Sequence, residues 1–353
     1  MQHILMVNLE RGWRGGERQT LLTASELQQR GYRVTVLART GEALFKRATQ
    51  AGLRVKGVGG NAGLFWFLLR HRKAFDVVHV QTAGALTVVS AMKSWLQTPI
   101  VYTRRTSFEV KPAKAARTLA KWERVDQFVA ISQAAAQAPR AMGIEVAVIP
   151  SAVEFVPPDP DQIIAFSEEQ DLAGKFVLAT CAAFTPEKDP LTCVRAVHAL
   201  WQKRQDFVFL HFGAGGSELA AAQQLIQELG LEQVYKIVGF RRDIENMYRL
   251  MHVFVLSSKQ EALGSSILDA FLYEAAVVAT RAGGIPEVLD EGRGLLCDVG
   301  DAEAIATACH QLLEDESLCR DMVAKAEAWV VEEHAIPLMV DRYCDLYNHG
   351  RQS

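Results

Sequence analysis

Short apolar runs alternate with longer amphipathic stretches along nearly the whole chain. In the first half, six runs predict strands, at residues 4–9, 32–38, 76–80, 99–103, 127–132 and 146–150. Six more follow in the second half, at 175–182, 207–215, 235–240, 252–258, 276–282 and 294–299. The amphipathic stretches between them, such as 16–31 and 216–230, close on glycine, as helices often do. Strands that alternate with helices predict parallel sheets covered on both faces.

The pattern restarts after SAVEFVPPDPDQ, a proline-rich and acidic segment typical of a linker. We therefore expect two α/β domains, residues 1–155 and 156–335. The last amphipathic run, residues 336–353, can pack on either domain. In doubly wound sheets, ligands bind where the carboxyl ends of strands enter helices, so the loops after the strands are the candidate sites.

Charge is distributed unevenly. The formal net charge is −3, but residues 1–150 hold 22 basic and 9 acidic side chains, and the remainder holds 16 and 32. A basic domain favours an acidic partner such as phosphate, anionic lipid or nucleic acid. Two oppositely charged surfaces that attract each other would explain the asymmetry equally well. No nucleic-acid-binding module is recognisable, so we expect no nucleic-acid partner.

Cysteine spacing and hydropathy indicate the compartment. The six cysteines form neither a CxxC pair nor a metal-ligand pattern with histidine, which indicates free thiols in a reducing environment. No apolar run approaches the ~20 residues of a membrane helix, and the amino terminus predicts a strand in place of a signal peptide. We expect a cytoplasmic protein, at most peripheral on the cytoplasmic face of a membrane.

The first candidate loop, NLERGWRGGERQTLL, places Gly15 and Gly16 between a strand and a helix that begins near Glu17. Two glycines let a ligand approach the backbone, and a helix amino terminus favours phosphate. The spacing differs from GxGxxG, and Arg39 stands where a dinucleotide site needs an acid, so an NAD(P) oxidoreductase is disfavoured. A tight turn would explain the two glycines equally well.

Two further loops carry weaker indications. Lys188 in AAFTPEKDP follows a strand and directly precedes a helix, where its ammonium can meet a diphosphate. Taken alone, a lysine at a surface loop tip is the plainer explanation. Gly213 in HFGAGGSEL lies in another strand-to-helix loop of close backbone approach, and we include it among the donor-binding candidates.

The fourth loop, EALGSSILDAF, is the most informative. Gly264, Ser265 and Ser266 expose backbone amides at a helix start, where phosphate is stabilised. Asp269 lies one turn later on the same face as Ser265 and can bind a ribose diol. Glu261 precedes the helix, so capping gives it no role, whereas contact with sugar hydroxyls does. Together the four loops favour a nucleotide-sugar site.

Ten motifs, in order, resemble the retaining GT-B glycosyltransferases of family 4, also called group 1. They are GGERQTLL, DVVHVQTA, FVAIS, VIPSAVE, FTPEKDP, FGAGGSEL, VGF, EALGSSILDAF, GGIPEV and RGLLCDVGD, and the resemblance as a whole covers residues 4 to about 313. Each motif is modest alone, but the ordered set is specific. The resemblance implies two Rossmann-like parallel-sheet domains facing across a cleft, the first holding the acceptor and the second the donor. It also implies that the last helix, 336–353, crosses back to the first domain.

The resemblance assigns roles position by position. Lys188 resembles the lysine on the donor diphosphate, and Glu261 and Asp269 resemble the two acids of the E-x7-E motif, which contact the donor sugar and the ribose. The other implied donor contacts are Gly15 and Gly16 in the first domain, Gly264, Ser265 and Ser266 along the diphosphate, and Gly239, Phe240 and Arg241 beside the base.

Two positions depart from the family pattern. Ala183 stands where many relatives have an arginine that shares the diphosphate charge, a loss of about 1.5–3 kcal/mol if it is not replaced. Arg105 stands where a histidine often lies near the donor sugar, and an arginine cannot act as a general base. We expect Arg105 to supply the missing charge, as Arg241 or Arg242 also could, or to recognise an anionic acceptor. His79 is expected to fill a strand.

The implied reaction moves a hexose from a UDP- or GDP-linked sugar to a hydroxyl of a glycan or lipid-linked, lipopolysaccharide-type acceptor, with retention of anomeric configuration. Lys188, Glu261 and Arg105 are the expected catalytic residues. We expect no cofactor beyond the substrate and no metal, since no D-x-D stretch occurs. Two alternatives stay open: a non-catalytic subunit that binds a sugar nucleotide or glycan, and another GT-B enzyme such as a sugar-nucleotide epimerase or a phosphorylase.

The segment RRTSFEVKPAKAARTLAKWER holds seven basic and two acidic residues. With GLFWFLLRHRKAF, it predicts contact with an acceptor or an anionic membrane surface, at about 1 kcal/mol per cation. The candidate residues are Arg104, Lys111, Lys114 and Arg117. For LFWFLL, burial is the favoured interpretation, because exposed aromatic runs are rare.

Overall fold

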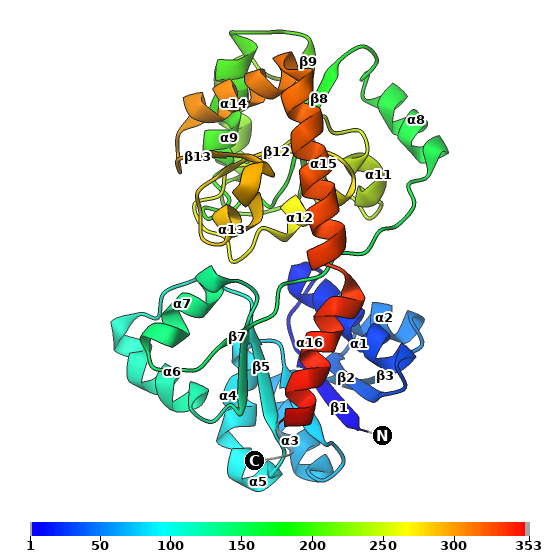
Figure 1. Ribbon diagram of the computed structural model, residues 1–353, viewed down its shortest axis with the longest axis vertical. Coiled ribbons are helices and arrows are strands. Elements are labelled where there is room, and N and C mark those ends of the chain that lie inside the picture. Colours follow the sequence, from blue (N-terminus) through cyan, green and yellow to red (C-terminus); the bar gives the residue numbers. More distant parts are fainter. Residues whose placement is uncertain (1, 350–353) are drawn as a thin grey trace. The chain divides into compact units, whose positions relative to one another are not determined.

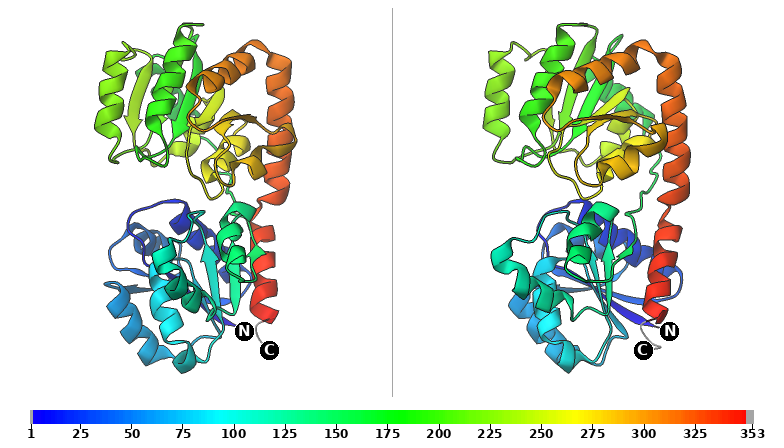
Figure 2. Two further views of the ribbon diagram at one scale, coloured as in Figure 1. Left: turned by 90° about the vertical axis from the view of Figure 1, so that its left-hand side faces the viewer. Right: turned by 60° about the vertical axis from the view of Figure 1, so that its left-hand side comes forward.

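The computed structural model describes residues 2–349 and divides into two compact units (Figure 1). One unit comprises Met1–Ala152 together with His334–Ser353, and the other is Val153–Glu333. Each contains one parallel β-sheet with helices on both faces (Figure 2). The α/β class and the two Rossmann-like sheets that the alternating pattern predicts are confirmed.

Among the described residues, the first sheet has seven strands in the order β3-β2-β1-β4-β5-β6-β7. Every residue of the central strand β1 is buried, because helices cover both faces of a parallel sheet. The strands are β1 (His3–Asn8), β2 (Arg33–Arg39), β3 (Arg54–Val58), β4 (Val77–Val80), β5 (Ile100–Arg104), β6 (Gln127–Ala130) and β7 (Ala147–Val148).

One of these strands, β3, is not among those that the apolar pattern predicts. It lies at the edge of the sheet, and four of its five residues are exposed or half-buried. Arg54 and Lys56 interrupt the apolar run, as charges on edge strands often do to discourage pairing with other chains. A strand of this kind lacks the pattern by which buried strands are recognised.

The helices of the first unit pack on both faces of this sheet. They are α1 (Gly15–Gln29), α2 (Ala43–Gln50), α3 (Asn61–His71), α4 (Ala83–Ala91), α5 (Lys93–Leu96), the short 3-10 helix η1 (Pro112–Lys114), α6 (Ala115–Trp122), α7 (Gln133–Ala141) and α16 (Ile336–His349). The last of these lies beside α1 (Figure 1). Its Tyr343 and Tyr347 are buried in one core with Ile4 and Met6, so the carboxy-terminal helix is an integral part of the first unit.

Among the described residues, the second sheet has six strands in the order β10-β9-β8-β11-β12-β13, at the six places where the pattern predicts them. They are β8 (Phe176–Cys181), β9 (Phe207–Phe212), β10 (Tyr235–Gly239), β11 (Val253–Leu256), β12 (Ala276–Thr280) and β13 (Leu295–Cys297). The helices are α8 (Pro160–Glu169), α9 (Pro190–Trp201), α10 (Leu219–Glu228), α11 (Ile244–Tyr248), α12 (Ser265–Leu272), α13 (Ile285–Leu289), the 3-10 helix η2 (Asp290–Gly292), α14 (Ala302–Glu314) and α15 (Glu316–Glu333).

The strand order fixes where a ligand can bind. In the first sheet the chain grows outward from β1 to β3 and then resumes on the other side at β4; in the second it does the same from β8 to β10 and resumes at β11. At such a reversal the loops diverge beyond the carboxyl ends of the two central strands and leave a crevice. The loops that follow β1, β4, β8 and β11 are therefore the structural candidates for a site.

Candidate functional site

In the second unit, Lys188 and Glu261 form an ion pair in the loops after β8 and β11. They are 73 residues apart in the sequence. Ser258 Oγ donates to the same carboxylate oxygen, Glu261 Oε1, at 3.0 Å. The side chains of Lys188 and Glu261 keep 25% and 12% of their surface exposed, so the pair is sheltered but reachable. The structure thus brings together two residues that the sequence singles out separately.

The loop that carries Glu261 rests on the glycine pair after β12. A Cβ atom at Gly283 would lie 1.7 Å from the carbonyl oxygen of Glu261, and one at Gly284 would lie 2.3 Å from that of Ala262. Gly283 also has a φ of +54°, in the left-handed region that favours glycine. The glycines of GGIPEV therefore position Glu261, a role that sequence reasoning did not give them.

A similar contact holds the loop that carries Lys188. A Cβ at Gly213 would lie 1.9 Å from the carbonyl oxygen of Ala182, and one at Gly216 would lie 2.0 Å from that of Phe184. Both carbonyls belong to the stretch that leads to Lys188. Backbone packing by itself thus requires glycine at Gly213, and the predicted donor contact there stays a prediction.

The helix α12 starts directly after Gly264, which has φ +85° and ψ 51°. The first amides of a helix have no intrahelical acceptor and carry partial positive charge, and here they belong to Ser265 and Ser266. Asp269 follows one turn later and is half-buried. Burial, together with the charge of Asp269, raises the pKa of the Cys181 thiol to about 12. Asp269 therefore lies near the carboxyl end of β8, on the same sheet edge as Lys188.

The segment after β10 lies at the edge strand of this sheet. Gly239 has a φ of +89°, and the Phe240 side chain is 60% exposed. Arg241 Nε donates to Asp243 Oδ1 at 3.0 Å, and its guanidinium lies 5.0 Å from the ring centroid of Phe166. Because Asp243 already pairs with Arg241, this arginine is a poor replacement for the one absent at position 183.

In the first unit, α1 begins at Gly15, two residues earlier than the pattern predicts. Glu17 is buried, and it accepts hydrogen bonds from the Arg14 amide at 3.0 Å and from Asn8 Nδ2 at 3.2 Å. Burial raises the pKa of Glu17. Gly15 and Gly16 are therefore the first turn of the helix and not a turn before it, and their amides belong to its positive end.

Arg105 lies against that same helix start. Its Cδ would be 3.5 Å from a Cβ at Gly16, an ordinary van der Waals distance, so the two residues are neighbours. Its Nη2 and Nε donate to Gln81 Oε1 at 2.9 and 3.2 Å, and its Nη1 donates to Ser151 Oγ at 3.3 Å. The Tyr343 hydroxyl is a further hydrogen-bond partner. These partners are neutral. Burial lowers the pKa of Arg105, although an arginine keeps its charge in proteins.

A buried polar network supports Arg105 from the core. His79 has no exposed surface, and its two ring nitrogens meet Tyr347 Oη at 2.7 Å and Thr103 Oγ1 at 2.8 Å. Thr103 Oγ1 also lies 3.0 Å from Tyr343 Oη. Burial, with a contribution from the charge of Arg105, lowers the pKa of His79 to about 3. His79 is a neutral residue inside a strand, and the tyrosines of α16 are site-supporting residues that sequence reasoning missed.

Arg104 is only 4% exposed, so it presents no cation to a membrane surface, and its predicted contact with an acceptor stays a prediction. Its guanidinium lies 5.3 Å from the ring centroid of Trp122, and its Nη2 donates to the Phe108 carbonyl. Successive strand residues point to opposite faces, so Arg104 and Arg105 face different surroundings. The other candidates of this segment, Lys111, Lys114 and Arg117, are exposed.

The apolar segment of α3 is only partly buried. Leu64 and Leu68 lie in the core, whereas Phe65 and Trp66 are 41% and 66% exposed. The favoured interpretation of LFWFLL as buried is therefore right for these leucines and wrong for the two aromatic residues. Over residues 2–349, no helix combines the length and the apolar character needed to cross a bilayer. In the same residues, no group of three or more His, Cys, Asp or Glu side chains could hold a metal ion.

Two family models match the chain, one on each unit. The model "Glycosyltransferase Family 4" matches residues 13–155, and the model "Glycosyl transferases group 1" matches residues 162–329. Both overlap the span of the resemblance, and the second extends beyond it to residue 329.

Curated relatives match over different lengths. N-acetyl-alpha-D-glucosaminyl L-malate synthase of Bacillus anthracis is 32% identical over 133 residues, 37% of this chain and 35% of that protein. The lipopolysaccharide core biosynthesis glycosyltransferase LpsE of Rhizobium meliloti is 29% identical over 171 residues, 48% of this chain and 49% of that protein. LpsD of the same organism is 24% identical over 348 residues, 95% of each chain. The chain thus spans a third to a half of the first two and nearly all of the third.

Solved structures match over the full length. Anabaena HepE in complex with UDP and glucose superimposes with a TM-score of 0.89 at 20% identity, over 99% of this chain and 100% of that one. A glycosyltransferase from Rickettsia africae gives 0.87 at 19% identity, over 100% and 99%. These likenesses confirm the predicted GT-B fold.

Proposed function

Since this chain belongs to the group 1, family 4 glycosyltransferases, we propose that it transfers a sugar from a nucleoside-diphosphate sugar to a hydroxyl of a glycan or lipid-linked acceptor. The observation that carries this proposal is the Lys188–Glu261 pair at the carboxyl edge of the second sheet, with the start of α12 in the same loop as Glu261. Asp269 lies near that edge too. A cation, a helix amino terminus and two carboxylates are the groups that a diphosphate, a sugar and a ribose require.

The chemistry asks mainly for electrostatic stabilisation. As the bond between the sugar and the diphosphate breaks, negative charge grows on the diphosphate. Lys188 and the α12 amides are proposed to bind that charge, while Glu261 turns from Lys188 to the hydroxyls of the donor sugar. Asp269 is proposed to bind the ribose. Gly239, Phe240 and Arg241 remain the proposed neighbours of the base, and Gly15 and Gly16 those of the phosphates and sugar.

Arg105 is proposed as the second cation of the reaction, acting on the diphosphate or on an anionic acceptor. Its hydrogen-bond partners Gln81 and Ser151 are neutral, so they orient the guanidinium without cancelling its charge. Removing one such group typically lowers the rate by about 10²–10³-fold.

We propose that the anomeric configuration is retained, with an oxygen of the leaving phosphate taking the proton of the acceptor hydroxyl, and that no metal ion takes part. The anomeric signal of the product in proton NMR tests retention, and an inverted product would overturn it. Turnover that EDTA abolishes and magnesium or manganese restores would overturn the proposal of metal independence.

The acceptor is proposed to be of the cell-envelope type, reached at the cytoplasmic face of a membrane. Matching proteins include two named for lipopolysaccharide core biosynthesis, and Lys111, Lys114 and Arg117 are exposed in the first unit. Flotation with vesicles tests the membrane part. Binding that increases with the content of anionic lipid supports it, and binding that ignores anionic lipid would remove it.

The donor class is tested by thermal unfolding of the wild type and of Lys188→Ala with UDP, GDP, ADP, CMP and NADP. A nucleotide at 100 times its Kd adds about 2.7 kcal/mol of stability. We expect UDP or GDP to raise the Tm of the wild type and not that of the variant. If no nucleotide shifts the Tm, a non-catalytic subunit becomes the better account. Sugar interconversion in the absence of any acceptor would instead indicate an epimerase.

A further inference from the structure

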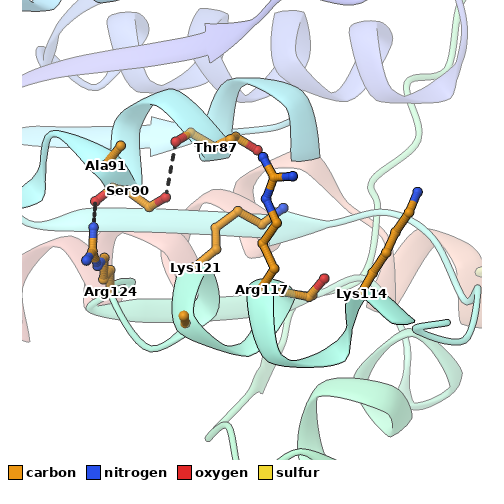
Figure 3. A pocket seen from close by; sticks show the side chains of 9 residues that line it. Thr87, Ser90, Ala91, Lys114, Arg117, Lys121 and Arg124 are labelled. Carbon is orange, nitrogen blue, oxygen red and sulfur yellow. Dashed lines mark hydrogen bonds between the residues drawn. The ribbon is translucent and has the colours of Figure 1, made fainter. Parts of the chain in front are cut away.

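A pocket of 410 Å³ lies between α4 and α6 in the first unit (Figure 3). The pocket is separate from the loops of the candidate site, since its lining residues include neither Arg105 nor any residue at the start of α1. Figure 3 shows Arg117 and Lys121 extending from α6 toward α4. The residues that give the pocket its character are Lys114, Arg117, Lys121 and Arg124 on one side, and Thr87 and Ser90 on the other.

The four cations come from successive segments: Lys114 ends η1, Arg117 and Lys121 lie on α6, and Arg124 follows that helix. Arg117 and Lys121 are four residues apart and therefore share one face of α6. In packed helices such positions are normally apolar, because they fill the contact between the two axes. Here Arg117 and Lys121 line the pocket, and the buried residue of α6 is Trp122.

Among the residues that the structure describes, no acidic side chain lines this pocket. Glu109 and Glu123, the two acids of the basic segment, are exposed and are not among its lining residues. Within residues 2–349, none of the four cations takes part in an ion pair. Burial and the neighbouring Arg117 both lower the pKa of Lys121, as expected for cations crowded without a counter-charge.

The hydroxyl groups on the α4 side of the pocket already donate hydrogen bonds within that helix. Thr87 Oγ1 donates to the Ala83 carbonyl at 3.2 Å, and Ser90 Oγ donates to the Thr87 carbonyl at 3.4 Å. Arg124 Nη1 donates to the Ser90 carbonyl at 3.2 Å, which leaves its other donors unassigned. The cations are therefore the groups on which a ligand would depend.

We propose that this pocket binds a phosphate group, as a monoester or diester. Arginine donates in a fork that matches phosphate oxygens, and lysine adds a compact positive charge. The volume is within the range of small-ligand sites, about 300–1,000 Å³, so the phosphate can arrive with the molecule that carries it. Arg117 and Lys121, four residues apart on α6, repel each other, and a bound phosphate removes this cost.

Phosphate is thereby a chemical feature of the molecule that the first unit binds, and this inference rests on the proposed function to that extent. Two sources supply this chemistry: the phosphate of a soluble acceptor and the headgroup of an anionic lipid. The donor site in the second unit shares no residue with the pocket, so the two proposals fail separately.

The first arm of the test uses glycerol 3-phosphate in a phosphorus NMR titration. The pocket variant is Arg117→Gln/Lys121→Gln. The matched control, Lys46→Gln/Lys56→Gln, removes two exposed cations of the same unit that lie outside the pocket. We expect the pocket variant to bind at least about tenfold more weakly than the wild type, since two phosphate contacts are lost, and the control to bind like the wild type. Equal affinity in all three proteins would overturn the proposal.

A second pocket variant separates a built site from general attraction to a basic surface. Ala91→Phe places a ring in the pocket and leaves every charge in place, since Ala91 is an exposed lining residue of α4. It is expected to weaken binding as much as the double variant does. Undiminished binding in Ala91→Phe would show that the anion is held by diffuse charge, which contradicts the proposal.

The second arm identifies the source of the phosphate with vesicles of phosphatidylglycerol or of phosphatidylcholine alone. Loss of binding to phosphatidylglycerol vesicles in both pocket variants, but not in the control, assigns the pocket to a lipid headgroup. Binding of glycerol 3-phosphate without any vesicle binding assigns it to a soluble acceptor. If neither probe binds the wild type, the proposal is wrong. Nucleotide-induced shifts in Tm are expected to be the same in all these variants, which keeps the donor site out of the result.

Discussion

The two units place a cation at the carboxyl edge of the same kind of sheet, but they surround it differently. In the first unit, Arg105 is held by an amide oxygen and by hydroxyl groups. In the second, Lys188 is held by the carboxylate of Glu261. The first cation therefore has neutral hydrogen-bond partners and only a through-space attraction to the buried Glu17, whereas the second forms a direct ion pair.

This difference explains how each site would meet an anion. A guanidinium with neutral hydrogen-bond partners has already been desolvated at some cost, so an arriving anion displaces no ion-pair partner from it. An ammonium paired with a carboxylate yields less, because the anion must first draw it away from that partner. The first 150 positions hold 22 basic and 9 acidic residues, and Arg105, one of these basic residues, has no charged hydrogen-bond partner.

The loop glycines offer the sharpest way to break the second site without touching its charges. Gly283→Ala places a Cβ against the carbonyl oxygen of Glu261 at a position of positive φ. We expect a loss of about 2–5 kcal/mol in unfolding free energy and loss of transfer activity, because clash and strain add.

The matched control for that change is Gly174→Ala, at φ +70° in the same unit with open space around it. It carries the conformational strain alone, about 1–2 kcal/mol, and is expected to keep activity. Urea unfolding and transfer assays measure both variants. Equal costs in the two would show that the contact with the Glu261 loop is not what requires glycine at position 283.

The uncancelled charge of the first site is tested by Arg105→Gln, which keeps a hydrogen-bonding side chain and removes the charge. We expect kcat/KM for transfer to fall by about 10²-fold. Arg105→Lys, which restores the charge without the fork, is expected to recover part of the loss. If Arg105→Gln transfers sugar at the wild-type rate, the charge has no catalytic role.

Buried histidines give the two units a shared sensitivity to acid. His79 contacts Tyr347 Oη, and His211 contacts Tyr235 Oη, each at 2.7 Å. Burial lowers their pKa values to about 3 and about 4, from 6.5. Below pH 6.5 the unfolded chain therefore binds protons that the folded chain does not, so stability falls as the pH falls toward those values.

At pH 4 this cost is roughly 3 kcal/mol for each histidine. His79→Gln and His211→Gln are each expected to lose less stability than the wild type between pH 7 and pH 4, as measured by urea unfolding at the two values. Variants that follow the wild-type pH dependence would contradict the burial of neutral imidazoles.

The smallest expected effect distinguishes a tyrosine that orients Arg105 from one that only stabilises the core. Tyr343→Phe removes the hydroxyl near Arg105 and Thr103, and Tyr347→Phe removes the one that contacts His79. Each change is expected to cost about 1 kcal/mol of stability. Only Tyr343→Phe is expected to lower the transfer rate, by a few-fold. Equal rates in the two variants would make Tyr343 a purely structural residue.

Much of the fold can be predicted because buried parallel strands appear in the sequence as apolar runs. Twelve strands are predicted in this way, and the edge strand β3 is missed because Arg54 and Lys56 face solvent there. The start of α1 is misplaced by two residues because glycines weaken the helical pattern at Gly15 and Gly16.

The site is harder to predict, because it depends on contacts between distant segments. Lys188 and Glu261 stand out separately, but only the fold shows that they pair. A glycine that a ligand needs and one that the backbone needs look alike, so nothing marks Gly213 and Gly283 as packing positions. The alternation of side chains along a strand does predict that Arg104 and Arg105 point to opposite faces of the sheet.

The internal neutralisation of Lys188 is the central claim, and calorimetric titration of UDP and GDP into the wild type, Lys188→Ala and Glu261→Gln tests it most directly. Removing the lysine is expected to weaken the nucleotide that binds by at least about tenfold, the loss of a charge-assisted contact. Removing the charge of its partner is expected to leave affinity for the nucleotide equal to or greater than that of the wild type, because nothing then competes for the ammonium. Weaker binding in Glu261→Gln together with unchanged binding in Lys188→Ala would contradict the account.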